Sequence, residues 1–125
     1  MINDILLYVG SAVITLWGIA HIIPTKSVVN GFGKMSQDNR RIITMEWIAE
    51  GLTLCFIGLL VLFVTICGEA QNQTSAIVYL TSAVMLVVMA VLTSLTGART
   101  SIVPIKICPF VKIAVAILFF LGTVL

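Results

Sequence analysis

The sequence predicts an all-α membrane protein, a four-transmembrane-helix bundle, and two observations carry this prediction. Of the 125 residues, 60% are hydrophobic and only 10% are charged, whereas a soluble domain has about 25% charged residues. The chain also holds four stretches that supply the about 20 apolar residues a helix needs to cross the hydrocarbon. Runs 56–64 and 84–92 are apolar on every side, unlike the alternating strands of a membrane barrel. We therefore expect one integral membrane domain over 1–125.

The four predicted spans cover about 5–23, 42–66, 75–95 and 105–125. One face of the first span carries small or polar side chains at helical spacing, namely Ser11, Thr15, Gly18 and His21. Such faces let membrane helices approach closely, so we expect this face to meet another helix. Pro24 should end the span, because proline disfavours helical geometry in the residue before it. Gly31 and Gly33 then predict a turn-rich loop.

The second span begins with a capping signal. Ser36 or Asp38 can accept hydrogen bonds from free backbone N–H groups of the first turn. Gly51 and Gly58 lie seven residues apart, and we expect them to form a second face for close helix packing.

The third and fourth spans become polar toward the connection between them. The third span is apolar at first and then carries Thr93, Ser94 and Thr96. The fourth begins near Lys106, and Pro109 is expected in its first turns, where a missing N–H is harmless.

The basic residues predict the orientation of the chain. All seven lie in or beside the first and third connections: Lys26, Lys34, Arg40, Arg41, Arg99, Lys106 and Lys112. The N-terminal tail and the second connection hold only Asp4 and Glu69. Since Lys and Arg favour the cytoplasmic side, we expect both termini outside the cytoplasm, in a bacterial inner membrane. The N-terminus lacks the basic segment of a signal peptide, so the first span is expected to be retained.

Ionisable side chains lie at one depth in several spans. With a rise of 1.5 Å per residue, Glu46 lies roughly 7 Å and Glu50 roughly 13 Å beyond the boundary at Arg41. Counted from Lys26, Lys106 and Arg99 in the same way, His21 lies roughly 7 Å in, Lys112 roughly 9 Å in and Thr93 at a similar depth. Burying a charge in the bilayer costs about 2.5–3.5 kcal/mol, so these groups are expected to face the bundle interior and pair there. The resulting candidates for ligand or proton binding are Glu50, Glu46, His21, Lys112, Thr93 and Trp47.

Each candidate also has a structural interpretation. His21 can lie among headgroups, Glu46 can pair with an interfacial Arg, and Lys112 can extend to the headgroups. Glu50 can simply hold helices together, and Trp47 can be a packing or belt aromatic. Glu46, Glu50 and His21 could share a metal ion, but one His without a nearby Cys makes a poor zinc site. We therefore predict no metal and no cofactor, and the sequence does not support nucleic-acid binding.

The four-span layout, together with the stretch Gly18-Ile19-Ala20-His21, resembles the DoxX-like group of small bacterial membrane proteins. The resemblance covers the chain by topology and this stretch by residues, and the basic residue expected at the start of the first helix is missing. It implies a four-helix fold and, for some members, a link to quinol oxidation. Small multidrug-type transporters have a similar size, but they carry their membrane Glu in the first helix rather than the second.

Three functions follow as hypotheses. The leading one is binding or translocation of a small or amphipathic ligand, with Glu50 as the key ionisable residue. The first alternative is a structural or accessory membrane subunit. The second is an intramembrane enzyme acting on a lipid or quinone, with His21 and Glu46 as acid and base, although no recognisable catalytic set is present. The expected partners are the lipid bilayer and either a second copy of the chain or another membrane protein.

Overall fold

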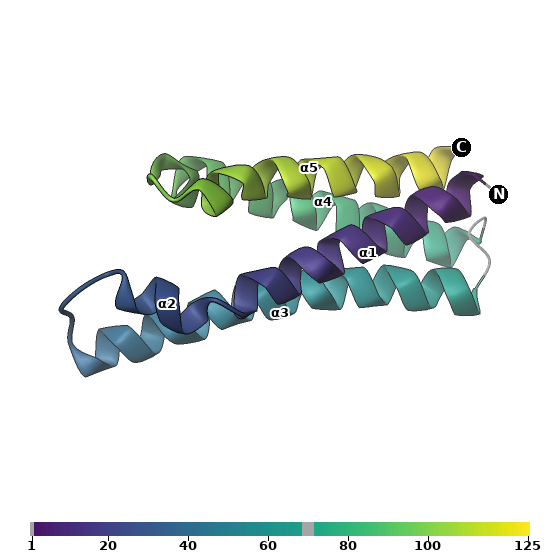
Figure 1. Ribbon diagram of the computed structural model, residues 1–125. Helices are drawn as coiled ribbons and strands as arrows, with labels where there is room; N and C mark the ends of the chain where they lie inside the picture. Colours follow the sequence, from purple (N-terminus) through teal and green to yellow (C-terminus); the bar gives the residue numbers. More distant parts are fainter. Residues whose placement is uncertain (1, 69–71) are drawn as a thin grey trace.

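The computed structural model describes residues 2–68 and 72–125, and Glu69 lies outside this part. Within it, the chain forms helices and no strand. Four long helices are apolar enough to cross a membrane: α1 (Ile2–Ile22), α3 (Gln37–Cys67), α4 (Gln73–Leu95) and α5 (Val103–Val124) (Figure 1). Two short elements complete the fold, α2 (Thr25–Asn30) and the 3-10 helix η1 (Gly97–Arg99). The predicted all-α, four-helix membrane bundle is confirmed, and the protein is an integral membrane protein.

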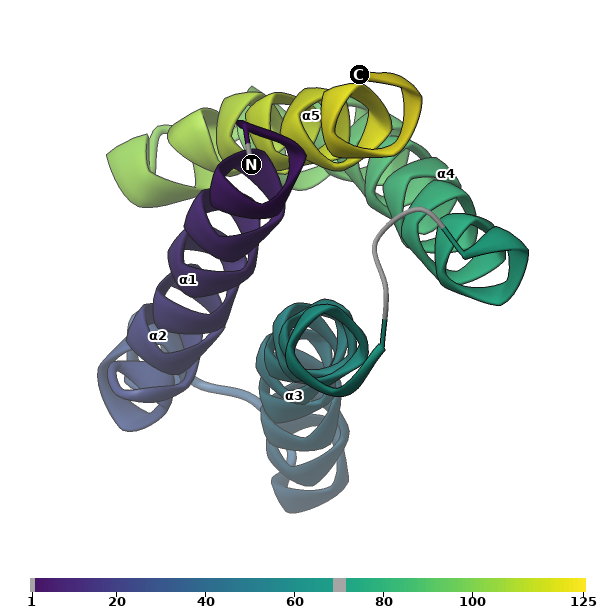
Figure 2. The same cartoon turned by 90° about the vertical axis from the view of Figure 1, so that its right-hand side faces the viewer.

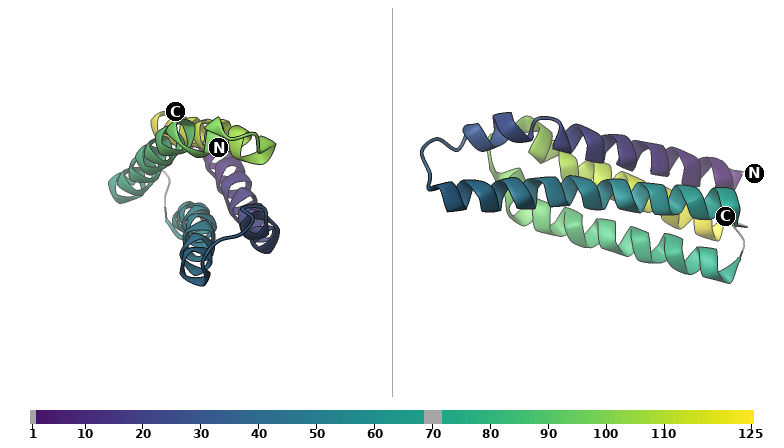
Figure 3. Two further views of the ribbon diagram at one scale, coloured as in Figure 1. Left: turned by 90° about the vertical axis from the view of Figure 1, so that its left-hand side faces the viewer. Right: turned by 90° about the horizontal axis from the view of Figure 1, so that it is seen from below.

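The long helices form an open arc rather than a closed square. Helix α1 packs against both α3 and α5, and α4 packs against α5, whereas α3 and α4 make few contacts. Viewed from either end, α3 and α4 stand at the two tips of the arc (Figures 2 and 3). The gap between these two helices is the main departure from a regular four-helix bundle.

The two ends of the bundle differ. The start of α1 and the end of α5 lie at one end, which we call the termini end; α2 and η1 lie at the other, which we call the basic end (Figure 1). At the termini end, the hydroxyls of Thr65 and Tyr79 lie 3.0 Å apart and join α3 to α4. There too, Asn3 Nδ2 donates to the carbonyl of Gly122 at 3.2 Å and joins α1 to α5. The bundle is thus tied together at the termini end.

The core between these ends is apolar and drawn from all four long helices. Its fully buried side chains include Leu7, Ile14, Leu54, Val61, Tyr79, Leu86, Val115 and Phe119. In water, burying apolar surface stabilises a fold by about 25 cal/mol per Å². In lipid that gain is absent, and close packing of these side chains stabilises the bundle instead.

The small faces predicted on the first and second spans meet each other. A Cβ built on Gly18 would lie 2.8 Å from the carbonyl oxygen of Gly51, and one on Gly58 would lie 2.9 Å from that of Ser11. Helices α1 and α3 therefore approach so closely that their backbones touch. Both predictions of close-packing faces are confirmed.

Helix boundaries agree with the sequence in two places. Helix α1 ends at Ile22, just before Pro24, and Ser36 caps α3, since its side chain accepts from the N–H of Asn39 at 3.1 Å. Helix α3 has 31 residues, so at 1.5 Å per residue it is roughly 46 Å long. Its first turns, with α2, extend beyond α4 and α5 (Figure 1).

The structure adds one element and corrects one expectation. The sequence did not predict α2, in which the Thr-Lys-Ser-Val-Val-Asn segment after Pro24 continues as a short helix before the predicted turn at Gly31. Pro109 lies in the second turn of α5, among the first turns as predicted, but its missing N–H is not harmless. Because α5 begins at Val103, Pro109 is inside the helix and lacks the N–H that would bond the carbonyl of Ile105. Pro104 occupies the favourable first-turn position instead.

Candidate functional site

A cavity of about 880 Å³ lies in the basic half of the bundle, where α3 and α4 diverge. All four long helices contribute to its lining. Much of the wall is apolar, with Met85, Met89, Leu92, Ile102, Pro104 and Ile105. Two tryptophans, Trp17 and Trp47, and three ionisable side chains, His21, Glu46 and Glu50, also line it. The cavity thus combines an apolar body with a small polar region.

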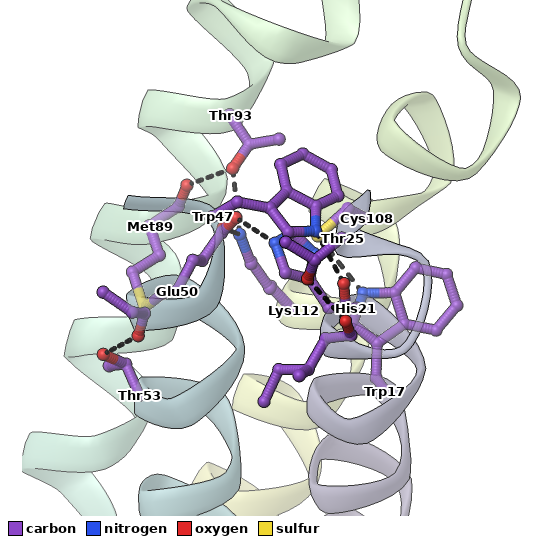
Figure 4. A network of polar contacts seen from close by, with 12 residues as sticks. Trp17, His21, Thr25, Trp47, Glu50, Thr53, Met89, Thr93, Cys108 and Lys112 are labelled. Carbon is purple, nitrogen blue, oxygen red and sulfur yellow. Dashed lines mark hydrogen bonds and ion pairs between the residues drawn. The ribbon is translucent and has the colours of Figure 1, made fainter. Parts of the chain in front are cut away.

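The polar region is organised by a buried lysine. Lys112 of α5 is 0% exposed, and its Nζ donates to Glu50 Oε1 of α3 at 2.5 Å and to Thr93 Oγ1 of α4 at 2.9 Å (Figure 4). Thr93 in turn donates to the carbonyl of Met89 at 2.8 Å. One ammonium therefore ties three helices together, and Lys112 does not extend to the headgroups.

His21 completes the cluster from α1. Its Nε2 lies 3.2 Å from Glu50 Oε2, and its side chain is only 9% exposed. The contact lacks hydrogen-bond geometry, so Nε2 is buried without a hydrogen-bond partner in the described part of the chain. Glu50 therefore faces Lys112 with one carboxylate oxygen and His21 with the other.

Trp47 fixes the position of His21. The two rings stack with centroids 4.0 Å apart and planes inclined by 16°. Trp47 Nε1 also donates to the backbone carbonyl of His21 at 2.7 Å. This indole therefore joins α3 to α1 and lines the cavity.

Glu46, Glu50 and Thr53 follow one another at helical spacing on one face of α3, and all three line the cavity. Glu46 is exposed, and within residues 2–68 and 72–125 it forms no ion pair. The interfacial Arg40 instead donates to Asn30 Oδ1 at 2.8 Å. The structure thus joins His21, Trp47, Glu50, Thr93 and Lys112 by direct contacts and leaves Glu46 separate at the cavity wall.

The sequence did not single out Trp17 and Cys108. Trp17 Nε1 lies 3.2 Å from Cys108 Sγ, to which it donates across the α1–α5 contact. Trp17 precedes His21 by four residues, and this helical spacing could have placed it on the same face. Nothing in the sequence marks Cys108 as its partner.

The chemistry available to the site is that of ion pairing, hydrogen bonding and aromatic contact. In the described part of the chain no hydrogen bond or ion pair joins His21 to Glu46, the predicted acid–base pair. Nor does that part contain a group of three side chains placed to hold a metal ion.

Comparison with known proteins adds no relative: the chain matches no family model, no curated protein and no solved structure. The resemblance to the DoxX-like group therefore stays a prediction.

Proposed function

We propose that this protein binds a small amphipathic molecule in the cavity between α3 and α4. The observation that carries the proposal is a volume of about 880 Å³ with apolar walls and a polar cluster on one side. Ligand sites in proteins are concave, mostly apolar and supplied with a few placed polar groups, at about 300–1,000 Å³. The apolar body would lie against α4 and α5, and the polar head would face Glu50 and His21.

The surroundings of the cavity favour a ligand that arrives from the bilayer. Met85 and Leu92 of α4 and Ala49 of α3 line the cavity and are exposed on the surface of the bundle. These helices are the tips of the open arc, so a molecule dissolved in lipid could pass between them. Binding is favoured over a pore, because the termini end is tied by the Thr65–Tyr79 contact.

The same proposal includes an orientation. The basic end carries Lys26, Lys34, Arg40, Arg41, Arg99 and Lys106, and such residues favour the cytoplasmic side. The cavity would then open in the cytoplasmic leaflet of a bacterial inner membrane, with both termini outside. A second copy of the chain or another membrane protein remains the proposed partner.

Both tryptophans of the chain line the cavity, so intrinsic fluorescence reports on its occupancy. We would titrate the protein in dodecyl maltoside micelles with three probes brominated in the chain: dodecyltrimethylammonium, dodecanol and dodecylsulfonate. Saturable quenching by at least one probe is expected. Ala49→Phe should weaken it about tenfold by filling the cavity, equivalent to about 1.4 kcal/mol.

Ala12→Phe is the matched control, because Ala12 is exposed on α1 and does not line the cavity. It should leave the titration unchanged. If none of the three probes quenches saturably, the protein does not bind amphiphiles in this cavity. Glu50→Gln is a poorer test, because it would leave the buried ammonium of Lys112 without its charged partner.

A structural role is the second candidate, and the contacts of Lys112 favour it. A buried side chain that joins α3, α4 and α5 would hold an accessory subunit together without any ligand. For the enzyme hypothesis the structure adds only that its proposed acid and base, His21 and Glu46, line the same cavity.

A further inference from the structure

We infer that the ligand of this cavity carries a cationic head, an amine or a quaternary ammonium group. The inference rests on the proposed function and specifies the class of ligand. Its basis is the sign and arrangement of the charges at the cavity wall.

The charged groups that reach the cavity are acidic. Glu46 and Glu50 line it, whereas Lys112 does not. Within the joined cluster Glu50 (−1) and Lys112 (+1) cancel with a neutral His21, so the separate Glu46 gives the cavity wall a net charge of −1. Among the described residues no ion pair neutralises Glu46. An anionic head would meet two carboxylates, whereas a cationic head would supply the missing charge.

Lys112 contacts Glu50 without lining the cavity, so Glu50 lies between the buried ammonium and the cavity. Its ammonium engages Oε1 of Glu50 and the hydroxyl of Thr93, which leaves Oε2 on the side of His21. The site therefore presents Oε2 and the carboxylate of Glu46, one helical turn away on α3, to the same space.

His21 gives an independent sign that this region is built for an occupant. Its side chain is more than nine-tenths buried, lines the cavity and leaves Nε2 without a hydrogen bond in the described part of the chain. Buried polar atoms nearly always have a hydrogen-bond partner. A primary amine would satisfy both atoms by opening the 3.2 Å contact between Nε2 and Glu50 Oε2.

The aromatic content of the wall fits the same class. Trp17 and Trp47 line the cavity beside the carboxylates. Indole faces attract ammonium groups, including quaternary ones that cannot donate hydrogen bonds. Carboxylates and indoles together therefore suit both kinds of cationic head, and the apolar wall on α4 and α5 suits a lipophilic body.

The test compares the three brominated probes with one another. Dodecyltrimethylammonium should bind at least about tenfold more tightly than dodecanol or dodecylsulfonate, which share its chain but not its charge. Glu46→Gln should weaken the ammonium probe about tenfold and leave dodecanol unchanged. Asp38→Asn removes the same charge from an exposed residue of α3 outside the cavity and should change neither.

The outcomes separate the two proposals. Saturable binding of dodecanol or the sulfonate with affinity equal to that of the ammonium probe would overturn the cationic head while upholding amphiphile binding. An unchanged ammonium affinity in Glu46→Gln would also overturn it. Absence of saturable quenching by every probe would overturn the proposed function itself.

A final arm identifies the source of the cation, which is either a lipid headgroup or a free lipophilic amine. Phosphatidylethanolamine added to the micelles should displace the ammonium probe if the ligand is a lipid, and should not if it is a free amine. Either result upholds the cationic head. Equal displacement by phosphatidylglycerol, which has no ammonium, would overturn it.

Discussion

Lys112 shows how one residue can decide the stability of this bundle. It is fully buried in a membrane-spanning helix, and Glu50 is its charged partner. Removing one member of a buried ion pair leaves an uncompensated charge and costs about 3–5 kcal/mol, whereas replacing both members by apolar or neutral groups is often nearly neutral. The cost of each single substitution should therefore come mainly from the partner that remains.

We predict that Glu50→Gln lowers the free energy of unfolding by about 3–5 kcal/mol, because it leaves the fully buried Lys112 without its charged partner. Lys112→Met should cost less, because the Glu50 side chain that remains is 30% exposed at the cavity wall. The double variant should lose less than the sum of the two. Unfolding by sodium dodecyl sulfate in mixed micelles, followed by circular dichroism, measures all four proteins of the cycle. Additive losses would mean that the two side chains are not coupled, and the structural role of the pair would then be abandoned.

The sequence predicted the level at which the site residues lie along their helices, but not how each helix is rotated about its own axis. Counting helical rise from the basic residues placed His21, Glu50, Thr93 and Lys112 at one level, and the structure brings them into contact. The count could not say which side of each helix faces inward. It also gave no hint that Trp17 would reach Cys108. Glu46 shares the face of Glu50 but lies one turn nearer the basic end, and the count could not show that only Glu50 reaches Lys112 and His21.

The close approach of α1 and α3 depends on glycine at the contact between the two helices. A Cβ on Gly18 would meet backbone atoms of α3, the carbonyl oxygen of Gly51 at 2.8 Å and the N of Cys55 at 2.9 Å. Backbone atoms cannot rotate away, so the helices themselves would have to separate. A Cβ on Gly10, on the same helix, would meet only side-chain atoms of Phe119 and Leu118.

Gly18→Ala is therefore predicted to destabilise the protein by about 1–3 kcal/mol through overpacking. Gly10→Ala should cost less, because the ring of Phe119 can turn and alanine is the better helix former. The same detergent unfolding assay compares the two variants. A loss at Gly10 equal to that at Gly18 would show that backbone contact does not set the α1–α3 distance.

The elements themselves were largely predictable, and the errors have a local cause. Hydrophobic length locates a membrane span, and capping residues such as Ser36 mark its start. The effect of Pro109 was misjudged because a proline in a hydrophobic run does not reveal how many residues of the helix precede it. The open arc was not predictable at all, since the gap between α3 and α4 depends on which helices pair.

For the whole molecule, the proposed orientation decides which leaflet the cavity faces. Cys67 is exposed at the termini end, whereas Ser101 is exposed in the segment between η1 and α5 at the basic end. The other two cysteines, Cys55 and Cys108, are half-buried and buried within the spans. A membrane-impermeant maleimide can therefore distinguish the two ends.

We predict that the maleimide labels Cys67 in spheroplasts, which have lost the outer membrane and wall but keep a sealed inner membrane. In a Cys67→Ser background, Ser101→Cys should be labelled only after the membrane is permeabilised. The reverse pattern would place the basic residues outside, against the preference of Lys and Arg for the cytoplasm. The cavity and its charges would then stand unchanged, because they follow from contacts within the bundle, but the ligand would have to come from the outer leaflet.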